Sequence, residues 1–144
     1  MTMATSTVPA TLAALTELLA DQDYPLRQPS VTLGLPRQPE REMVIVGNVS
    51  GDQQWASIGT QRRDETYTVD LYTVVLWPGY TALEAMQRAW ELFGTVETAI
   101  RSNVQVGGTG VLWNEIAAPT GDLTVEDEGY AYQVTSALRV RARI

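Results

Sequence analysis

The sequence predicts an α+β fold: a mostly antiparallel β-sheet with two main helices packed on one face. Two stretches repeat apolar residues at helical spacing, and each is followed by stretches with strand patterns, in the order helix, strand, strand, helix, strand, strand. Consecutive strands favour antiparallel pairing, with the helices collected on one face of the sheet. Because 144 residues suffice for one hydrophobic core, we expect a single domain over residues 1–144.

The first helix is predicted from position 8 to about position 21. Apolar residues recur at helical spacing from Val8 to Leu19, Ser6 or Thr7 can serve as the N-cap, and Pro9 suits the first turn. A proline-rich link follows, in which "SVTLGL" has the character of a short strand. The stretch 42–51, "EMVIVGNVSG", is typical of a buried strand that ends in a turn.

The strongest strand signal is the stretch 62–79. Alternate residues from Tyr67 to Trp77 form one nearly continuous apolar face. The opposite face is polar up to Asp70 and apolar at positions 72, 74 and 76. We therefore expect a helix or another subunit to cover the second half of that face as well.

A second helix follows directly, because Thr81 and Glu84 form a capping box. Its predicted apolar stripe consists of Leu83, Met86, Trp90, Phe93, Val96 and Ile100. The pattern of residues 104–119 predicts two short strands joined by a glycine-rich turn. The stretch 120–129, "TGDLTVEDEG", predicts an acidic loop with a short strand at 123–125, and a long strand closes the chain from 130 to 144.

Composition excludes several classes of protein. Cysteine and histidine are absent, which removes disulfides, thiol nucleophiles and the commonest general base and metal ligand. A net charge of −7 argues against a general nucleic-acid binder. All ten basic residues are arginine, which fits a GC-rich genome or selection for bidentate contacts. We expect a protein that is made in a cytoplasm and has no membrane partner, because the N-terminus lacks a basic region and no stretch approaches ~18 apolar residues.

Three motifs contain residues that could carry chemistry. "GGTG" at 107–110 lacks the Lys-Ser/Thr of a phosphate loop, so a hairpin turn explains it better. The carboxylates of 122–128 could bind a hard cation, but their spacing differs from an EF-hand and favours a solvated acidic loop. Asp64 and Glu65 could act as an acid–base pair, yet surface ion pairs with Arg62 and Arg63 explain them at least as well. We therefore expect no enzymatic activity, cofactor or metal.

Four ordered stretches carry a resemblance to a known family: "VIVGNVSGDQQWASIGTQRRDETYTVDLYTVVLWPG", "RAWELFGTVETAIRSN", "VGGTG" and "VRARI". Together with the first helix they resemble the tail terminator (tail completion) proteins of long-tailed bacteriophages, particularly those of actinobacterial hosts. The resemblance implies a hexameric ring at the head-proximal end of the tail tube. Such a ring ends tube polymerisation, binds the tail tube protein and a head-side connector protein, and lets DNA pass through its lumen without sequence-specific binding.

The same resemblance implies localisation in the tail or neck of the virion and assembly in the host cytoplasm. Two alternatives stay open. One is another neck component, a head-closure or head–tail connector protein, which would meet the same partners from the head side. The other is a small cation- or ligand-binding enzyme built around the acidic loop.

Three arginines of the last strand are candidates for contacts between subunits. In "TSALRVRARI", Leu138 and the apolar residues that alternate with the arginines point into the sheet's covered face. Arg139, Arg141 and Arg143 therefore emerge on the other face, where they would meet carboxylates of this or a neighbouring subunit. Asp70 is the acidic counterpart that the sequence predicts if the two strands pair.

Two further segments are candidates for contact with the tail tube or connector. An aromatic residue in a polar, turn-like stretch can anchor an interface, and acidic side chains can meet a basic partner. The candidate residues are Asp52, Gln53, Gln54, Trp55, Glu126, Asp127 and Glu128. Ordinary solvated surface is the alternative for each of them.

Overall fold

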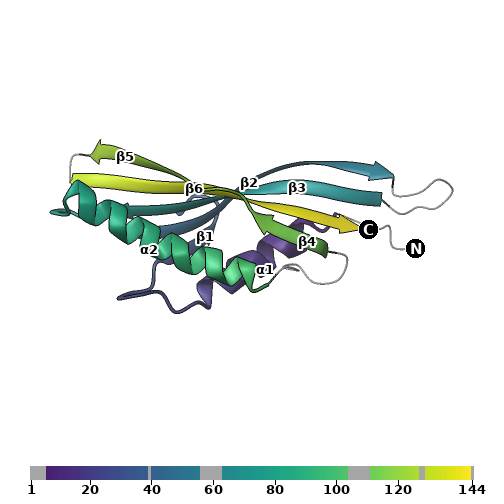
Figure 1. Cartoon of the computed structure of the whole chain (residues 1–144), viewed down its shortest axis with the longest axis horizontal. Helices are drawn as coiled ribbons and strands as arrows, with labels where there is room; N and C mark the ends of the chain where they lie inside the picture. Colours follow the sequence, from purple (N-terminus) through teal and green to yellow (C-terminus); the bar gives the residue numbers. More distant parts are fainter. Residues whose placement is uncertain (1–5, 39, 56–62, 104–110, 127–128, 144) are drawn as a thin grey trace.

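The computed structural model describes residues 6–38, 40–55, 63–103, 111–126 and 129–143. Its elements are α1 (Val8–Ala20), β1 (Ser30–Leu33), β2 (Glu42–Trp55), β3 (Arg63–Leu76), α2 (Ala82–Arg101), β4 (Val111–Ile116), β5 (Thr120–Glu126) and β6 (Gly129–Arg143) (Figure 1). The predicted α+β class is confirmed. The two predicted helices begin within a residue of their expected positions, with Thr81 and Glu84 forming the expected capping box.

All six strands belong to one sheet with the order β1-β2-β3-β6-β4, in which β5 also pairs with β6. Only β1 and β2 pair in parallel; the other pairs are antiparallel. β4 and β5 occupy successive parts of the same edge of β6. Ala117 bridges them by donating its N–H to the carbonyl of Ala137 at 2.7 Å. Pro119, which has no N–H to donate, lies at the interruption.

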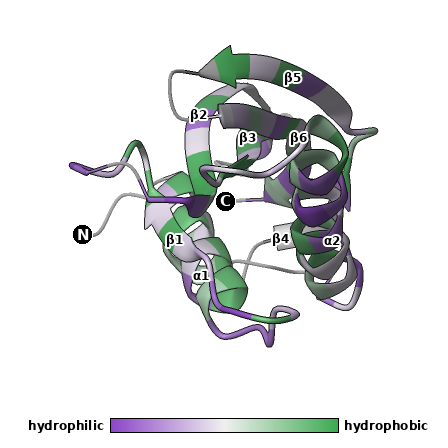
Figure 2. Cartoon of the chain, turned by 90° about the vertical axis from the view of Figure 1, so that its left-hand side faces the viewer, coloured by the Kyte–Doolittle hydropathy of each residue, from purple (hydrophilic) through white to green (hydrophobic). Residues whose placement is uncertain are grey.

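The core lies between this sheet and the two helices, which cover the same face (Figure 2). Alternate residues of each long strand point into it, as the period of two requires. The largest fully buried side chains are Leu15, Leu19, Leu71, Leu92, Ile100, Leu138, Val44, Val46, Val69, Val75, Val96 and Val134. The predicted inward face of β3, Tyr67 to Val75, is confirmed.

The buried face of α2 is rotated from the predicted stripe. Leu83 is 56% exposed, whereas Ala85, Ala89 and Ala99 are buried. Small alanine side chains let the helix backbone approach β3 and β6 closely, and this packing outweighs the larger apolar residues in deciding which face turns inward. Trp90 is half-buried and packs against the core, as does Trp77.

The acidic segment is a strand rather than the predicted loop. β5 runs from Thr120 to Glu126 and pairs with β6 over its whole length. The free edge of a fifteen-residue β6 supplies backbone partners to any neighbouring extended segment, so hydrogen bonding overrides the low strand propensity of Gly121 and Asp122. β2 likewise extends beyond its predicted end at Gly51 to Trp55, because β3 pairs with it from Val49 to Trp55.

The sheet face opposite the helices carries the apolar side chains at positions 72, 74 and 76 of β3, which we predicted to be covered by a helix or another subunit. Tyr72, Val74 and Leu76 are half-buried there, beside a buried Ile45. The helices lie on the other face, so cover by a helix is wrong for these residues (Figure 2). Cover by another subunit stays a prediction.

Candidate interaction surfaces

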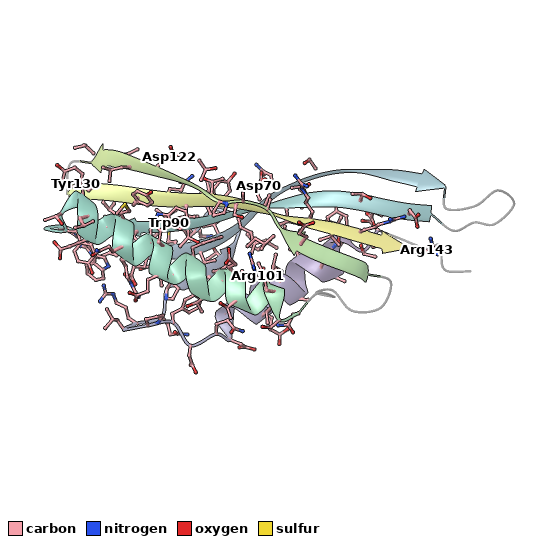
Figure 3. The ribbon with its side chains drawn as sticks, in the orientation of Figure 1. Asp70, Trp90, Arg101, Asp122, Tyr130 and Arg143 are labelled. Carbon is pink, nitrogen blue, oxygen red and sulfur yellow. The ribbon has the colours of Figure 1, made fainter. Side chains whose placement is uncertain are left out.

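Three arginines of β6 line the helix-free face of the sheet, and we call Arg139, Arg141 and Arg143 the arginine stripe. Their side chains are exposed. The antiparallel register sets them opposite Thr68, Thr66 and Asp64 of β3. The stripe thus forms a basic row along one half of an otherwise uncovered face, with Arg143 near its end (Figure 3).

Asp64 is the carboxylate that Arg141 and Arg143 meet within their own chain, whereas the β4–β6 register sets Glu115 opposite Arg139. Arg143 Nε lies 3.0 Å from Asp64 Oδ1, and Arg141 Nη2 lies 3.3 Å from Asp64 Oδ2. The hydrogen bond from Arg143, aided by Arg141, holds the pKa of Asp64 below its ordinary value. Both arginines are nearly half exposed, so these ion pairs contribute little to stability and leave guanidinium donors facing solvent.

Asp70 was predicted as the acidic counterpart, and within the chain this is wrong for Arg141 and Arg143. The strands do pair, but their register sets Asp70 opposite Ala137. Asp70 lies six positions along β3 from Asp64, which occupies the end of β3 that faces Arg143. Contact of the stripe with a neighbouring subunit stays a prediction.

For five of the seven other predicted contact residues the structure describes the backbone alone, and the remaining two lie outside the described residues. The backbone of β2 carries positions 52–55 to the end of the β2–β3 ribbon, where they pair with positions 66–63. The side chains at 52–55 and at Glu126 are not among those described, and Asp127 and Glu128 lie outside the described residues. Their contact with a tube or connector stays a prediction.

A buried charged cluster joins α2 to the start of β2, and it was not among the predicted sites. Arg88 and Glu42 are each about 4% exposed. Arg88 Nε donates to Glu42 Oε2 at 2.7 Å and Nη2 donates to Oε1 at 3.0 Å, a bidentate pair. Trp77 Nε1 also donates to Glu42 Oε2, at 3.0 Å.

The remaining donors of Arg88 hold the loop that follows α1. Nη1 donates to the carbonyl of Pro25 at 2.6 Å and to Glu91 Oε1 at 2.7 Å, while Nη2 donates to the carbonyl of Arg27 at 3.0 Å. The guanidinium of Arg27 in turn lies 4.7 Å from the centre of the Trp77 ring. One arginine therefore ties together α2, β2 and the α1–β1 loop.

Burial alone would raise the pKa of Glu42, but hydrogen bonds from Arg88, Trp77 and Arg27 and the charge of Arg88 outweigh it and lower that pKa. Burial likewise acts to lower the pKa of Arg88, and Glu42 and Glu91 overcome it and raise the pKa. Both groups are thus held charged. A charged pair whose hydrogen bonds are all made within the chain supports the fold rather than acid–base chemistry.

A second buried carboxylate, Glu65, caps the N-terminus of α1 from β3. It accepts hydrogen bonds from the Thr7 N–H at 3.0 Å, from Thr7 Oγ1 at 3.2 Å and from the Ser6 hydroxyl. Thr7 is the N-cap residue, but its own side chain makes no capping hydrogen bond. The expected surface role for Glu65 is therefore wrong: a carboxylate at a helix N-terminus satisfies free N–H groups and complements the helix dipole.

Replacing Glu65 by alanine is expected to lower the free energy of unfolding by about 1–2 kcal/mol, the size of a lost N-cap and helix-dipole contact. Urea denaturation followed by circular dichroism measures the change. Thr66→Ala, at the exposed neighbouring position on the opposite face, is the control. Equal costs for the two variants would contradict a capping role.

Two of the described buried carboxylates thus hold the chain together, and no group of three or more acidic side chains gathers as a metal site within the described ranges. No helix in the described part is long and apolar enough to cross a membrane. What distinguishes the surface is a helix-free sheet face with a basic row, and such a face suits contact with other macromolecules.

Several solved structures share the whole fold of this chain. The chain is similar in fold to a chain of the "Virion of native gene transfer agent (GTA) particle". The superposition has a TM-score of 0.54 at 14% sequence identity, and it covers 92% of this chain and 86% of the other. No protein-family model and no curated protein matches the sequence.

At this level of identity the likeness concerns the fold alone. It spans nearly the full length of both chains, so it involves the arrangement of the helices and the whole sheet rather than one shared motif. The arginine stripe and the helix-free face thus lie on a fold that also occurs in a virion.

Proposed function

We propose that this chain is a structural virion protein, a tail terminator whose subunits form a hexameric ring on the head-proximal end of the tail tube. The observation that carries the proposal is the shared fold with a chain of a gene transfer agent virion, over 92% of this chain. The family resemblance of the sequence narrows the place in the virion to the end of the tail. The ring ends tube polymerisation and offers its other surface to the head-side connector.

The surfaces of the subunit support a ring. A sheet face with half-buried Tyr72, Val74 and Leu76 and a row of arginines is a surface that a neighbouring subunit can cover. The buried carboxylates Glu42 and Glu65 are engaged by their own chain, which suits a structural protein without catalytic activity. A net charge of −7 favours a lumen that DNA passes without being held.

The same fold likeness also suits a head-closure or connector protein, because it concerns a virion as a whole. Binding assays with purified partners distinguish a tail terminator from a head-closure or connector protein. A tail terminator binds assembled tail tubes, whereas a head-side neck protein binds the portal side and leaves tubes unbound.

Deleting the gene from its phage is expected to produce overlong tails that are not joined to heads, because nothing then ends tube growth. Electron microscopy of the lysate measures tail length and joining. Supplying the wild-type protein in trans is the control and should restore both. Tails of normal length joined to heads in the deletion would overturn the proposal.

A further inference from the structure

Exposed large apolar side chains gather at the two edges of the sheet. Within the described residues there are seven of them, and six fall into two groups. Leu33 and Leu35 lie at β1, the first strand in the sheet order. The other four are Leu83, Leu123, Val125 and Tyr130. These belong to β5, the start of β6 and the start of α2 (Figures 1 and 3).

The group at β5 forms an exposed apolar surface, which we call the β5 patch. Val125 is 79% exposed, and Leu123 on the same side of the strand is 47% exposed. Beside them, on β6, Tyr132 accepts a hydrogen bond from Trp90 Nε1 at 3.2 Å, and its ring lies so close to Gly121 that a Cβ there would clash with it. The hydrogen-bonded pair of Trp90 and Tyr132 therefore supports the part of β5 that carries the exposed apolar side chains. The outer edge of β5 is an edge of the sheet.

The group at β1 borders a hollow, which we call the β1 groove. It has a volume of about 450 Å³ and is lined mainly by Leu12, Leu33, Leu35, Ile45 and Tyr72. Gly34 turns the chain at the end of β1 with φ of +78°, a conformation that favours glycine. This turn places Leu35, 87% exposed, at the rim of the groove.

The two surfaces are complementary in chemistry and charge. The β5 patch offers exposed branched side chains, and the β1 groove is a hollow with a mainly apolar lining that can accept them. Exposed Asp122 and Glu84 belong to the elements that carry the β5 patch, and exposed Arg37 follows Leu35, a residue that lines the groove, by two positions in the sequence. Opposite charges at the rim favour the pairing of these unlike surfaces over the pairing of like with like.

We propose that the β5 patch of one subunit inserts Val125 and Leu123 into the β1 groove of a second copy of this chain. The joint links two different surfaces on opposite edges of the sheet, so it is heterologous. Repeating it closes a ring when a whole number of the rotations between neighbouring subunits adds up to a full turn. It also covers two sheet edges whose exposure would invite aggregation. This inference rests on the proposed ring and assigns the surfaces that build it.

Two single variants test the joint through the mass of the assembly that each of them forms in solution. Val125→Asp breaks the patch and keeps the groove, while Leu35→Asp breaks the groove and keeps the patch. Thr124→Asp and Gln38→Asp add the same charge at exposed neighbouring positions and serve as matched controls. Because all four side chains are exposed, circular dichroism and the unfolding midpoint should match the wild type.

Native mass spectrometry and light scattering are expected to show a ring for the wild type and both controls, and a monomer for each patch or groove variant alone. An equimolar mixture of Val125→Asp and Leu35→Asp should give a dimer and nothing larger, because it contains one intact patch facing one intact groove. Raising the salt concentration should weaken the wild-type ring.

Other outcomes overturn the inference. Rings in either variant would place the joint elsewhere, and dimers of each variant alone would indicate like-with-like contacts. A mixture that stays monomeric, or a monomeric wild type, would remove the joint as well. Overlong tails on gene deletion together with rings in both variants would leave the proposed function standing and this inference alone defeated.

Discussion

Replacing Arg88 by methionine is expected to lower the free energy of unfolding by about 3–5 kcal/mol, because it leaves a buried carboxylate without its bidentate partner. Glu42 would keep the hydrogen bond from Trp77, at 3.0 Å, and the ion pair with Arg27, at 3.2 Å. The carbonyls of Pro25 and Arg27 would also lose their donors. Urea denaturation at neutral pH measures the change.

Two further variants test the cause of that loss. Gln87→Met, at the exposed position before Arg88 on the same helix, should change stability by less than about 0.5 kcal/mol. In a Glu42→Gln background, Arg88→Met should cost less than in the wild type, because no unpaired charge is left behind. An equal cost in both backgrounds would show that the pair is not coupled.

The free energy of unfolding that is lost in Arg88→Met should depend on pH. The folded-state pKa of Glu42 is lowered, so its contribution to stability is present above the unfolded pKa of about 4.3 and is lost as the pH falls through the folded value. In Arg88→Met, burial instead favours the protonated carboxyl, whose charge penalty disappears in acid. The gap between the two proteins should therefore narrow below about pH 4; a gap that widens would contradict this account.

Local patterns predicted the elements best. The Thr81–Glu84 capping box, the alternation of Tyr67 to Val75 and the proline in the first turn of α1 act within a few residues, and the structure confirms each of them. β5 was expected only in part, because its strand depends on an edge that β6 supplies from farther along the chain.

The charged sites depend on distance in sequence and on register, which local patterns do not contain. Glu42 and Arg88 are 46 residues apart. One signal was available: Arg88 stands on the helix face shared by Ala85 and Leu92, where a charge needs a buried partner. Asp64 rather than Asp70 meets the stripe because the β3–β6 register, with Asp64 opposite Arg143, decides which residues face each other.

The arginine stripe carries the second large prediction. Arg139→Glu and Arg141→Glu are each expected to prevent ring assembly, because the stripe would then present a negative charge to the carboxylates of a neighbouring subunit. Like charges across an interface cost several kcal/mol, and each ~1.4 kcal/mol weakens a contact about tenfold. Ser50→Glu, at an exposed position on β2 that is separated from the stripe by β3, adds negative charge without removing or facing an arginine and serves as the control for general repulsion.

A charge swap separates contacts within the chain from contacts between chains. Arg141→Glu opposes Asp64, its partner at 3.3 Å, so the single variant disturbs both kinds of contact. Adding Asp64→Arg restores an opposite pair between positions 64 and 141, although it removes the partner of Arg143, and it leaves the charge at position 141 reversed toward a neighbour. If the neighbour supplies the carboxylates, the swapped protein stays monomeric by light scattering. If the swap restores assembly, the arginine stripe makes its contacts within its own chain. If every variant forms normal rings but DNA fails to pass, the stripe faces the lumen instead.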